Sequence, residues 1–245
     1  MPASIDLNCD LGESTPARPI ADEPLFGVVS SANVACGFHA GGDATMRRSV
    51  ELAIVHGVVL GAHPGYRDAE GFGRRELGTP ADELAAELLA QLEALDGVAR
   101  AAGQRVRYVK AHGALYHRLG VDEVAARAHA RAIAAFDPAL AVLGAAGGAL
   151  ERAADATGLR FAREAFADRG VRTDGSLVPR GEPGAVLTDP AAAGRRAVEL
   201  AARVDVDSIC FHGDTPGAAS IGRAVRDALE AAGFAVRSFA TEPVA

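Results

Sequence analysis

The chain has 245 residues, a formal net charge of −7, 49% hydrophobic residues and 23% charged residues. This length and mixture favour one α/β domain over residues 1–245 and argue against disorder or a fibrous repeat. The acidic balance argues against a polyanion-binding surface, so nucleic acid is not an expected partner. Three cysteines without metal-knuckle spacing, no secretory leader and no apolar run of roughly 20 residues predict a reduced, cytoplasmic protein away from membranes.

Short β-type runs alternate with helical patterns along the chain. The expected strands cover residues 4–8, 30–36, 58–63, 106–110, 140–144, 160–166, 208–212 and 234–239. Thr79, Asp189 and Thr215 each precede a proline, an arrangement typical of a helix start. This alternation predicts parallel strands joined by right-handed crossovers, and hence a barrel or a doubly wound sheet.

Polar residues at the strand ends favour the barrel. In the first strand, the two-residue period places Asp6, Asn8 and Asp10 on one face, opposite an apolar face. Later strands end in the same way, with His63, Tyr108, Lys110, His112, Glu164, Asp168, His212 and Asp214. In a (β/α) barrel these ends converge on one mouth, where active sites form, whereas a doubly wound sheet would gather them at one switch point.

Lys110 is the only lysine among 25 basic residues. An ammonium is a compact charge whose pKa can be lowered by burial, which a guanidinium cannot provide. We therefore expect Lys110 to bind a carboxylate or a developing oxyanion in a pocket. The simpler alternative is that one lysine survived by drift in an arginine-rich chain.

The sequence leaves metal binding open. Asp10, His39, His63, His112 and His212 are residue types that bind divalent cations, but no HxxxH or CxxC pair is present. Asp43 lies four residues after His39, yet we expect it to cap the helix that buries Met46, Val50 and Ile54. Neither a GxxxxGK[ST] nucleotide loop nor a GxSxG elbow occurs, and Cys9 and Cys36 are expected to be buried and structural.

Eight segments resemble the LamB/YcsF, or lactam-utilisation, family between about residues 4 and 233. They are "IDLNCDLGES", "SSANVACGFHAG", "GAHPGYRD", "GFGRR", "VKAHGALY", "FADRG", "DGSLVPR" and "HGDTPGA". The resemblance implies a seven-stranded (β/α) barrel related to the glycoside hydrolase and deacetylase barrels. It also implies cleavage of 5-oxo-L-proline to L-glutamate in a complex with partner subunits B and C, with ATP as co-substrate of the complex.

The family's motif residues define the expected site. The resemblance implies catalytic roles for Asp10, Glu13, Lys110, His112 and His212, and substrate binding by Asp6, Asn8, Asn33, His39, His63, Tyr116, Glu164, Asp168, Arg169 and Asp214. Asp10 or Glu13 would be the general base for water, and His112 or His212 would protonate the leaving nitrogen.

The chain departs from the family pattern at Gly42, Ala111 and Val171, where an acid, a proline and a tyrosine are usual. Two other functions stay open at this point. One is a metal-dependent, deacetylase-like hydrolase acting on carbohydrate, and the other is a subunit that binds the lactam without catalysis. Fold kinship by itself cannot decide between them, because one fold carries many activities.

Overall fold

The computed structural model describes residues 3–172, 177–179 and 181–240. Its strands are β1 (Ser4–Leu11), β2 (Ser31–Ala35), β3 (Val59–His63), β4 (Tyr108–Val109), β5 (Ala141–Ala145), β6 (Phe161–Phe166), β7 (Ser208–His212) and β8 (Ala235–Val236). Its helices are α1 (Glu23–Phe26), α2 (Asp43–His56), α3 (Ala81–Ala101), α4 (Gly113–Val121), α5 (Glu123–Phe136), α6 (Ala149–Thr157), α7 (Pro190–Ala201) and α8 (Ala218–Ala231).

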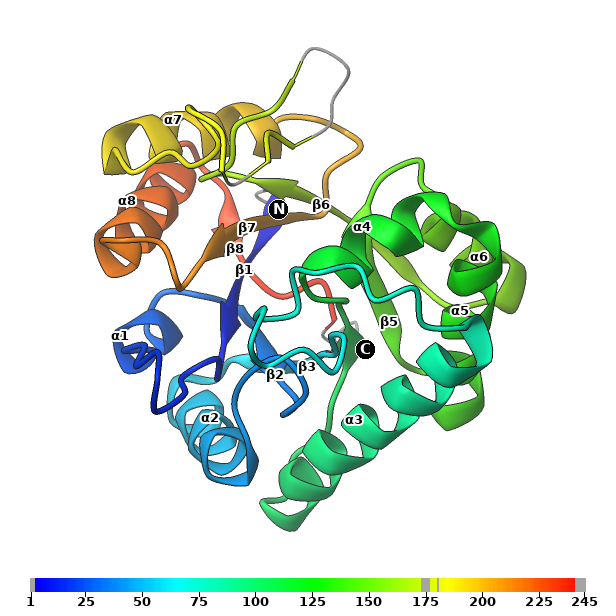
Figure 1. Ribbon diagram of the computed structural model, residues 1–245. Coiled ribbons are helices and arrows are strands. Elements are labelled where there is room, and N and C mark those ends of the chain that lie inside the picture. The colour runs from blue at the N-terminus through cyan, green and yellow to red at the C-terminus, as the bar shows by residue number, and fades with distance from the viewer. Residues whose placement is uncertain (1–2, 173–176, 180, 241–245) are drawn as a thin grey trace.

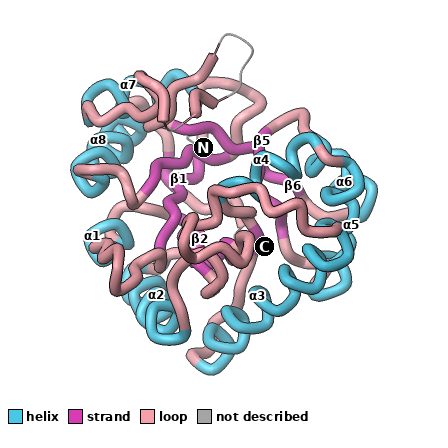
Figure 2. The backbone as a smooth tube through the Cα atoms, in the orientation of Figure 1, coloured by secondary structure: helices cyan, strands magenta, loops and turns pink. Residues whose placement is uncertain are grey.

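Strands β1 to β7 form a closed parallel barrel, because β1 pairs with β2 on one side and with β7 on the other. The short β8 pairs with Ser4 and Ile5 at the beginning of β1. Helices surround the strands as an outer ring in Figure 1, and Figure 2 shows the same ring in cyan around the magenta strands. The expected seven-stranded barrel is confirmed, and the doubly wound sheet is excluded.

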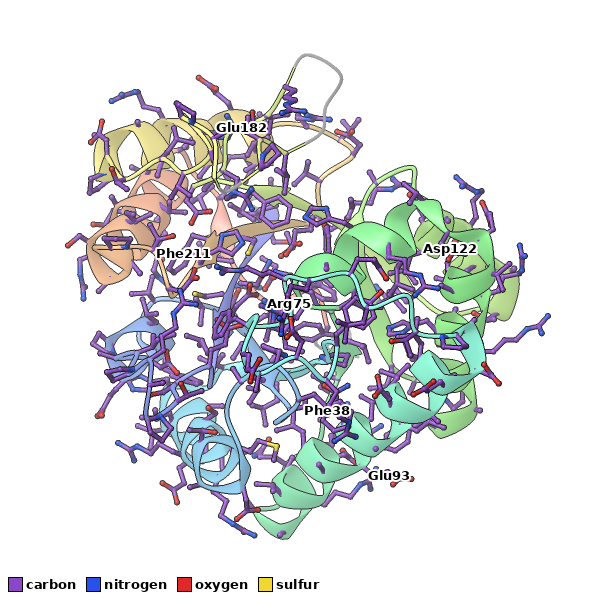
Figure 3. All side chains as sticks on the ribbon, viewed as in Figure 1. Phe38, Arg75, Glu93, Asp122, Glu182 and Phe211 are labelled. Atoms are coloured by element: carbon purple, nitrogen blue, oxygen red, sulfur yellow. The ribbon has the colours of Figure 1, made fainter. Side chains whose placement is uncertain are left out.

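The main apolar core lies between the strands and the helices. Outward-facing residues of β1 are buried there, together with Leu84, Leu88, Leu92 and Leu95 of α3 and Ile221, Val225 and Leu229 of α8. Figure 3 shows Phe211 of β7 beside α8, where a Cβ on Gly222 would overlap its ring. Inside the barrel, by contrast, Asp6, Asn8 and Asn33 are buried polar residues. The alternation predicted for β1 is therefore confirmed.

Several local expectations were wrong. Helix α3 begins after Pro80 instead of Thr79, and α8 begins after Gly217, while the Thr215 hydroxyl donates to Asp168. Asp43 is not the cap of α2, because Gly42 occupies that position and the exposed Asp43 pairs with Arg47. Ile54 of the same helix is 45% exposed instead of buried. Asp189 does cap α7, where its carboxylate accepts from the amide of Ala191.

Three further observations concern the described residues. No helix among them is both long and apolar enough to cross a membrane. Cys9 and Cys36 are free and buried, as expected, and Cys210 is free and buried as well. Positions 174–176 and 180 of the "DGSLVPR" segment lie outside the described part of the chain.

Candidate active site at the mouth of the barrel

A cavity of about 990 Å³ opens at the carboxyl ends of the strands. The loop of residues 64–80 between β3 and α3 crosses in front of the barrel in Figure 1, and Figure 3 places Arg75 on it. Residues predicted from the sequence that line the cavity are Asp10, Glu13, His63, Lys110, His112, Tyr116, Arg169, His212 and Asp214. The expectation that strand-end polar residues gather at one mouth is confirmed.

Two carboxylates and two imidazoles form a compact cluster in the floor of this cavity. Asp10 Oδ2 lies 3.4 Å from His63 Nε2, and Glu13 Oε1 lies 3.2 Å from His112 Nδ1. The facing ring nitrogens, His63 Nε2 and His112 Nδ1, are 3.1 Å apart. We call Asp10, Glu13, His63 and His112 the acid–histidine cluster; all four are buried.

His39 supports this cluster from behind. Its ring stacks on His112 with centroids 3.8 Å apart, and its Nε2 lies 3.2 Å from Glu13 Oε1. A Cβ on Gly73, which has a positive φ of 64°, would lie 2.8 Å from atoms of both histidines, so glycine makes room for the stack. Burial lowers the pKa of His39 to about 3, which keeps this imidazole neutral.

The carboxylates of the cluster stay ionised despite their burial. Burial alone would raise the pKa of Glu13, but the neighbouring His112 and His39 outweigh it and lower that pKa below its usual range. Asp10 follows the same pattern, because His63 and Lys110 lower its pKa against the effect of burial. The pKa of His63 is in turn raised by Asp10, although burial opposes the shift.

Lys110 lies between two buried carboxylates. Its Nζ is 3.0 Å from Asp10 Oδ1 and 2.8 Å from Glu164 Oε1, and it also approaches Asn8 Oδ1 at 3.3 Å. Burial would lower the pKa of the amine, but Asp10, Cys210 and Glu164 raise it well above its usual value. Of the two properties that a lysine could supply, the structure favours a fixed cation over a titratable amine.

His212 and Asp168 form a separate pair on the other wall. His212 Nδ1 lies 2.9 Å from Asp168 Oδ1, and the same carboxylate accepts from the His212 backbone amide at 3.0 Å. The ring of Phe166 stacks on the imidazole with centroids 5.6 Å apart. Because Asp168 engages Nδ1, the ring nitrogen left for chemistry in the cavity is Nε2.

Arg74 and Phe72, at the rim of the cavity, are functional candidates that the sequence did not predict. Asp214 accepts from Arg18 at 2.8 Å and from Arg74 at 2.6 Å, and Arg74 also lines the cavity. Phe72 has a φ of 55° and presents its carbonyl oxygen to His112 Nε2 at 2.8 Å. Arg74 lies in the "GFGRR" segment noted for its family resemblance, but no periodicity marks either residue.

Some predicted substrate-binding residues lie outside the cavity lining. Asp6, Asn8 and Asn33 occupy the barrel interior, where Asp6 accepts from the hydroxyls of Ser30, Ser31 and Ser208. Burial raises the pKa of Asp6 to about 6. Asn33 donates to Asn8 and Asp10 and accepts from Tyr108 at 2.6 Å. These contacts link the interior to the cluster above it.

Arg169 and Tyr116 both line the cavity, but Arg169 contacts backbone oxygens of a neighbouring loop whereas Tyr116 lies near the Glu164 carboxylate. Arg169 donates to the backbone oxygens of Ala185 and Val178 and thereby holds the loop beside the cavity. Burial, and then the Glu164 carboxylate, raise the pKa of the Tyr116 phenol.

Of the departures from the family pattern, Ala111 lines the cavity and Val171 is 41% exposed.

The fold and the site define a (β/α) barrel with an acid–histidine cluster at the carboxyl ends of its strands. Residues 5–243 match the model of the LamB/YcsF family, so the chain belongs to that family. Among its relatives, the A subunit of 5-oxoprolinase from Streptomyces avermitilis is 51% identical, with 96% of this chain and 100% of the relative covered. The protein of the same name from Heliobacterium modesticaldum is 46% identical, with 96% and 97% covered.

Solved structures agree with this assignment. The lactam utilization protein of Thermus thermophilus superposes with a TM-score of 0.90 at 42% identity, covering 96% of this chain and 100% of that one. The catalytic domain of a peptidoglycan N-acetylglucosamine deacetylase from Eubacterium rectale gives a TM-score of 0.54 at 11% identity, covering 99% and 91%. The second likeness shows the shared barrel fold alone.

Proposed function

We propose that this chain acts as the A subunit of an ATP-dependent 5-oxoprolinase, opening 5-oxo-L-proline to L-glutamate together with partner subunits B and C. The observation that carries the proposal is full-length similarity to proteins named as the A subunit of 5-oxoprolinase, with 51% and 46% identity. The convergence of the motif residues on one cavity supports it independently, because acids, histidines and a lysine gathered there suit amide hydrolysis.

The chemistry explains why ATP is needed. A five-membered lactam is a stable amide, so its opening by water is driven by transfer of the terminal phosphoryl group of ATP to the lactam oxygen. Water then adds to the activated carbon, and the ring carbon–nitrogen bond breaks while the nitrogen takes up a proton, which leaves an acyl phosphate. A second water hydrolyses the acyl phosphate and releases phosphate and glutamate. The sequence has no GxxxxGK[ST] loop. We therefore assign phosphorylation to the partners and hydrolysis to this barrel.

His212 is the best placed proton donor for the leaving nitrogen. Its Nδ1 lies 2.9 Å from Asp168, which orients the ring, and its side chain lines the cavity. Both ring nitrogens of His112 are already engaged, one by Phe72 and the other within the acid–histidine cluster. Of the two histidines considered from the sequence, we therefore assign the acid to His212.

The carboxylates of Asp10 and Glu13 are the candidate bases for the attacking water. Asp10 Oδ1 already accepts from Asn33 and Lys110, so Oδ2 is the oxygen that faces the cluster. Lys110 holds Asp10 and Glu164 and is enclosed by them, which limits its reach to a substrate carboxylate. Arg74, which lines the cavity and is 34% exposed, is the better partner for that carboxylate.

The test is glutamate release from 5-oxoproline and ATP. The chain alone, purified subunits B and C alone, and all three together are assayed at equal concentration. We expect glutamate from the full set and none from either part. Silence of the full set, with B and C shown to be active beside the corresponding chain of another species, would overturn the proposal.

A further inference from the structure

The tautomers of two histidines in the cluster are fixed by backbone carbonyls. His63 Nδ1 lies 2.8 Å from the oxygen of Lys110, and His112 Nε2 lies 2.8 Å from the oxygen of Phe72. A carbonyl oxygen can only accept, so each of these nitrogens carries a hydrogen. In the neutral rings, the opposite nitrogens therefore present lone pairs, and those two nitrogens face each other at 3.1 Å.

Two carboxylate oxygens point at the same place. The ligand atoms of Asp10, Glu13, His63 and His112 all lie within 4.8 Å of one another. An ionised carboxylate has no hydrogen to donate, so four electron-rich atoms converge with no donor of their own. A single shared proton can link one pair of them, whereas a metal cation can contact all four.

The surrounding charges lead to the same conclusion. Asp10, Glu13 and Glu164 are buried carboxylates, and Lys110 is the ammonium paired with two of them. Three buried carboxyl groups therefore surround a single ammonium group in this part of the site. Buried charges are costly unless they are paired, and a divalent cation would neutralise this group.

From this geometry we infer that Asp10, Glu13, His63 and His112 bind one divalent transition-metal cation of the zinc type. Two imidazole nitrogens and two carboxylate oxygens suit Zn²⁺, Co²⁺ or Mn²⁺ better than Mg²⁺ or Ca²⁺, which prefer oxygen ligands. A carbonyl bound to the second nitrogen of each ring is the usual support for a metal-binding histidine. His39, through its contacts with Glu13 and His112, is a positioning residue for the site.

The site lies in the floor of the same cavity as the proposed reaction, so its catalytic meaning rests on the proposed function. A divalent cation there would polarise a substrate oxygen or lower the pKa of a nearby water. Metal binding itself rests only on the four side chains. It can therefore be tested without partners or substrate.

The experiment measures metal binding by the full chain. After dialysis against a chelator, the chain is titrated with Zn²⁺, Co²⁺ and Mn²⁺ by calorimetry, and bound metal is counted by mass spectrometry. We expect one ion per chain and, with Co²⁺, a visible absorption band from nitrogen and oxygen ligands. His63→Gln and His112→Gln should each weaken Zn²⁺ binding by at least about 100-fold.

His117→Gln is the matched control, because His117 lines the same cavity but does not belong to the cluster. This variant should bind one ion with unchanged affinity. Glu13→Gln, which keeps the side-chain size, provides a second ligand variant if a histidine variant fails to fold. No stoichiometric ion and no Co²⁺ band in the folded parent chain would overturn the inference, even if the complex released glutamate. Binding of one ion without glutamate release would instead contradict the proposed function.

Discussion

The barrel interior has two polar levels that satisfy their buried groups in different ways. At the lower level, the Asp6 carboxylate accepts from three hydroxyls, and Asn33 accepts from the phenol of Tyr108. At the upper level, the carboxylates and ring nitrogens of the acid–histidine cluster face one another with few donors among them. Both levels are buried, so burial alone does not distinguish them.

This difference distinguishes the lower level, which stabilises the fold, from the upper level, which is available for function. A buried acceptor surrounded by donors is satisfied within the protein and needs nothing further. A buried cluster of acceptors is completed by something that the chain does not supply, such as a cation, a proton or a substrate. Substitutions at the lower level should therefore change stability with little effect on turnover, whereas those at the upper level should change turnover whether or not they also change stability.

The largest expected effect is at the His212–Asp168 pair. Asp168→Asn removes the carboxylate that orients the His212 ring, and should lower glutamate production by the full complex about 10²- to 10⁴-fold. Asp189→Asn, at the cap of α7, is the control that should keep full activity. Equal turnover in both variants would contradict the assignment.

Lys110→Met should be next in size, because it leaves Asp10 and Glu164 buried without their counter-ion. We expect the free energy of unfolding at pH 7 to fall by about 3–5 kcal/mol, measured by urea denaturation. Adding Glu164→Gln to this variant should restore part of the loss. A single variant as stable as the parent would show that the ion pairs at the upper level do not support the fold.

The raised pKa of Asp6, at the lower level, predicts that the free energy of unfolding depends on pH. Its folded pKa of about 6 exceeds the ordinary value of 3.8, so the folded state binds the extra proton between these pH values. Stability from this group is therefore highest below pH 4 and declines as the pH rises to 6. By urea denaturation, Asp6→Asn should gain roughly 3 kcal/mol relative to the parent between pH 4 and pH 7. A constant difference would indicate an unshifted Asp6.

Tyr108→Phe should have the smallest effect. It removes the donor to Asn33 and leaves that buried amide oxygen without this partner. The expected loss of stability is about 1–2 kcal/mol, with glutamate production by the complex changed far less than in Asp168→Asn. A turnover defect as large as that of Asp168→Asn would remove the distinction between the two levels.

Much of the fold could be predicted from the sequence, because strand period and helical spacing are local signals. The parity of β1 placed Asp6, Asn8 and Asp10 inside the barrel before any pairing was known. Helix starts were harder to predict, since Thr215 follows the usual capping pattern but is used to bind Asp168. Such competition for one hydroxyl depends on a contact between distant parts of the chain.

The gathering of polar side chains at the mouth of the barrel could be predicted from the sequence, but their individual contacts could not. Lys110 could be singled out because it is the only lysine of the sequence, yet its two carboxylate partners come from β1 and β6, far away in the sequence. Arg74 and Phe72 were missed because they belong to the irregular loop 64–80, where no period applies. Their contribution depends on the path of that loop across the barrel, and the neighbouring residue types do not specify this path.

The position of Tyr108 determines by which route substrate can enter the barrel and product can leave it. Its ring crosses the barrel so closely that a Cβ on Gly61 would overlap it, and Phe239 packs against its other side. The reaction chamber therefore has a blocked floor beneath its mouth. If an activated lactam arrives from a partner protein, that partner must dock over the carboxyl face, and glutamate must leave by the route through which the intermediate entered. Delivery of the intermediate and release of glutamate would then alternate through the same opening.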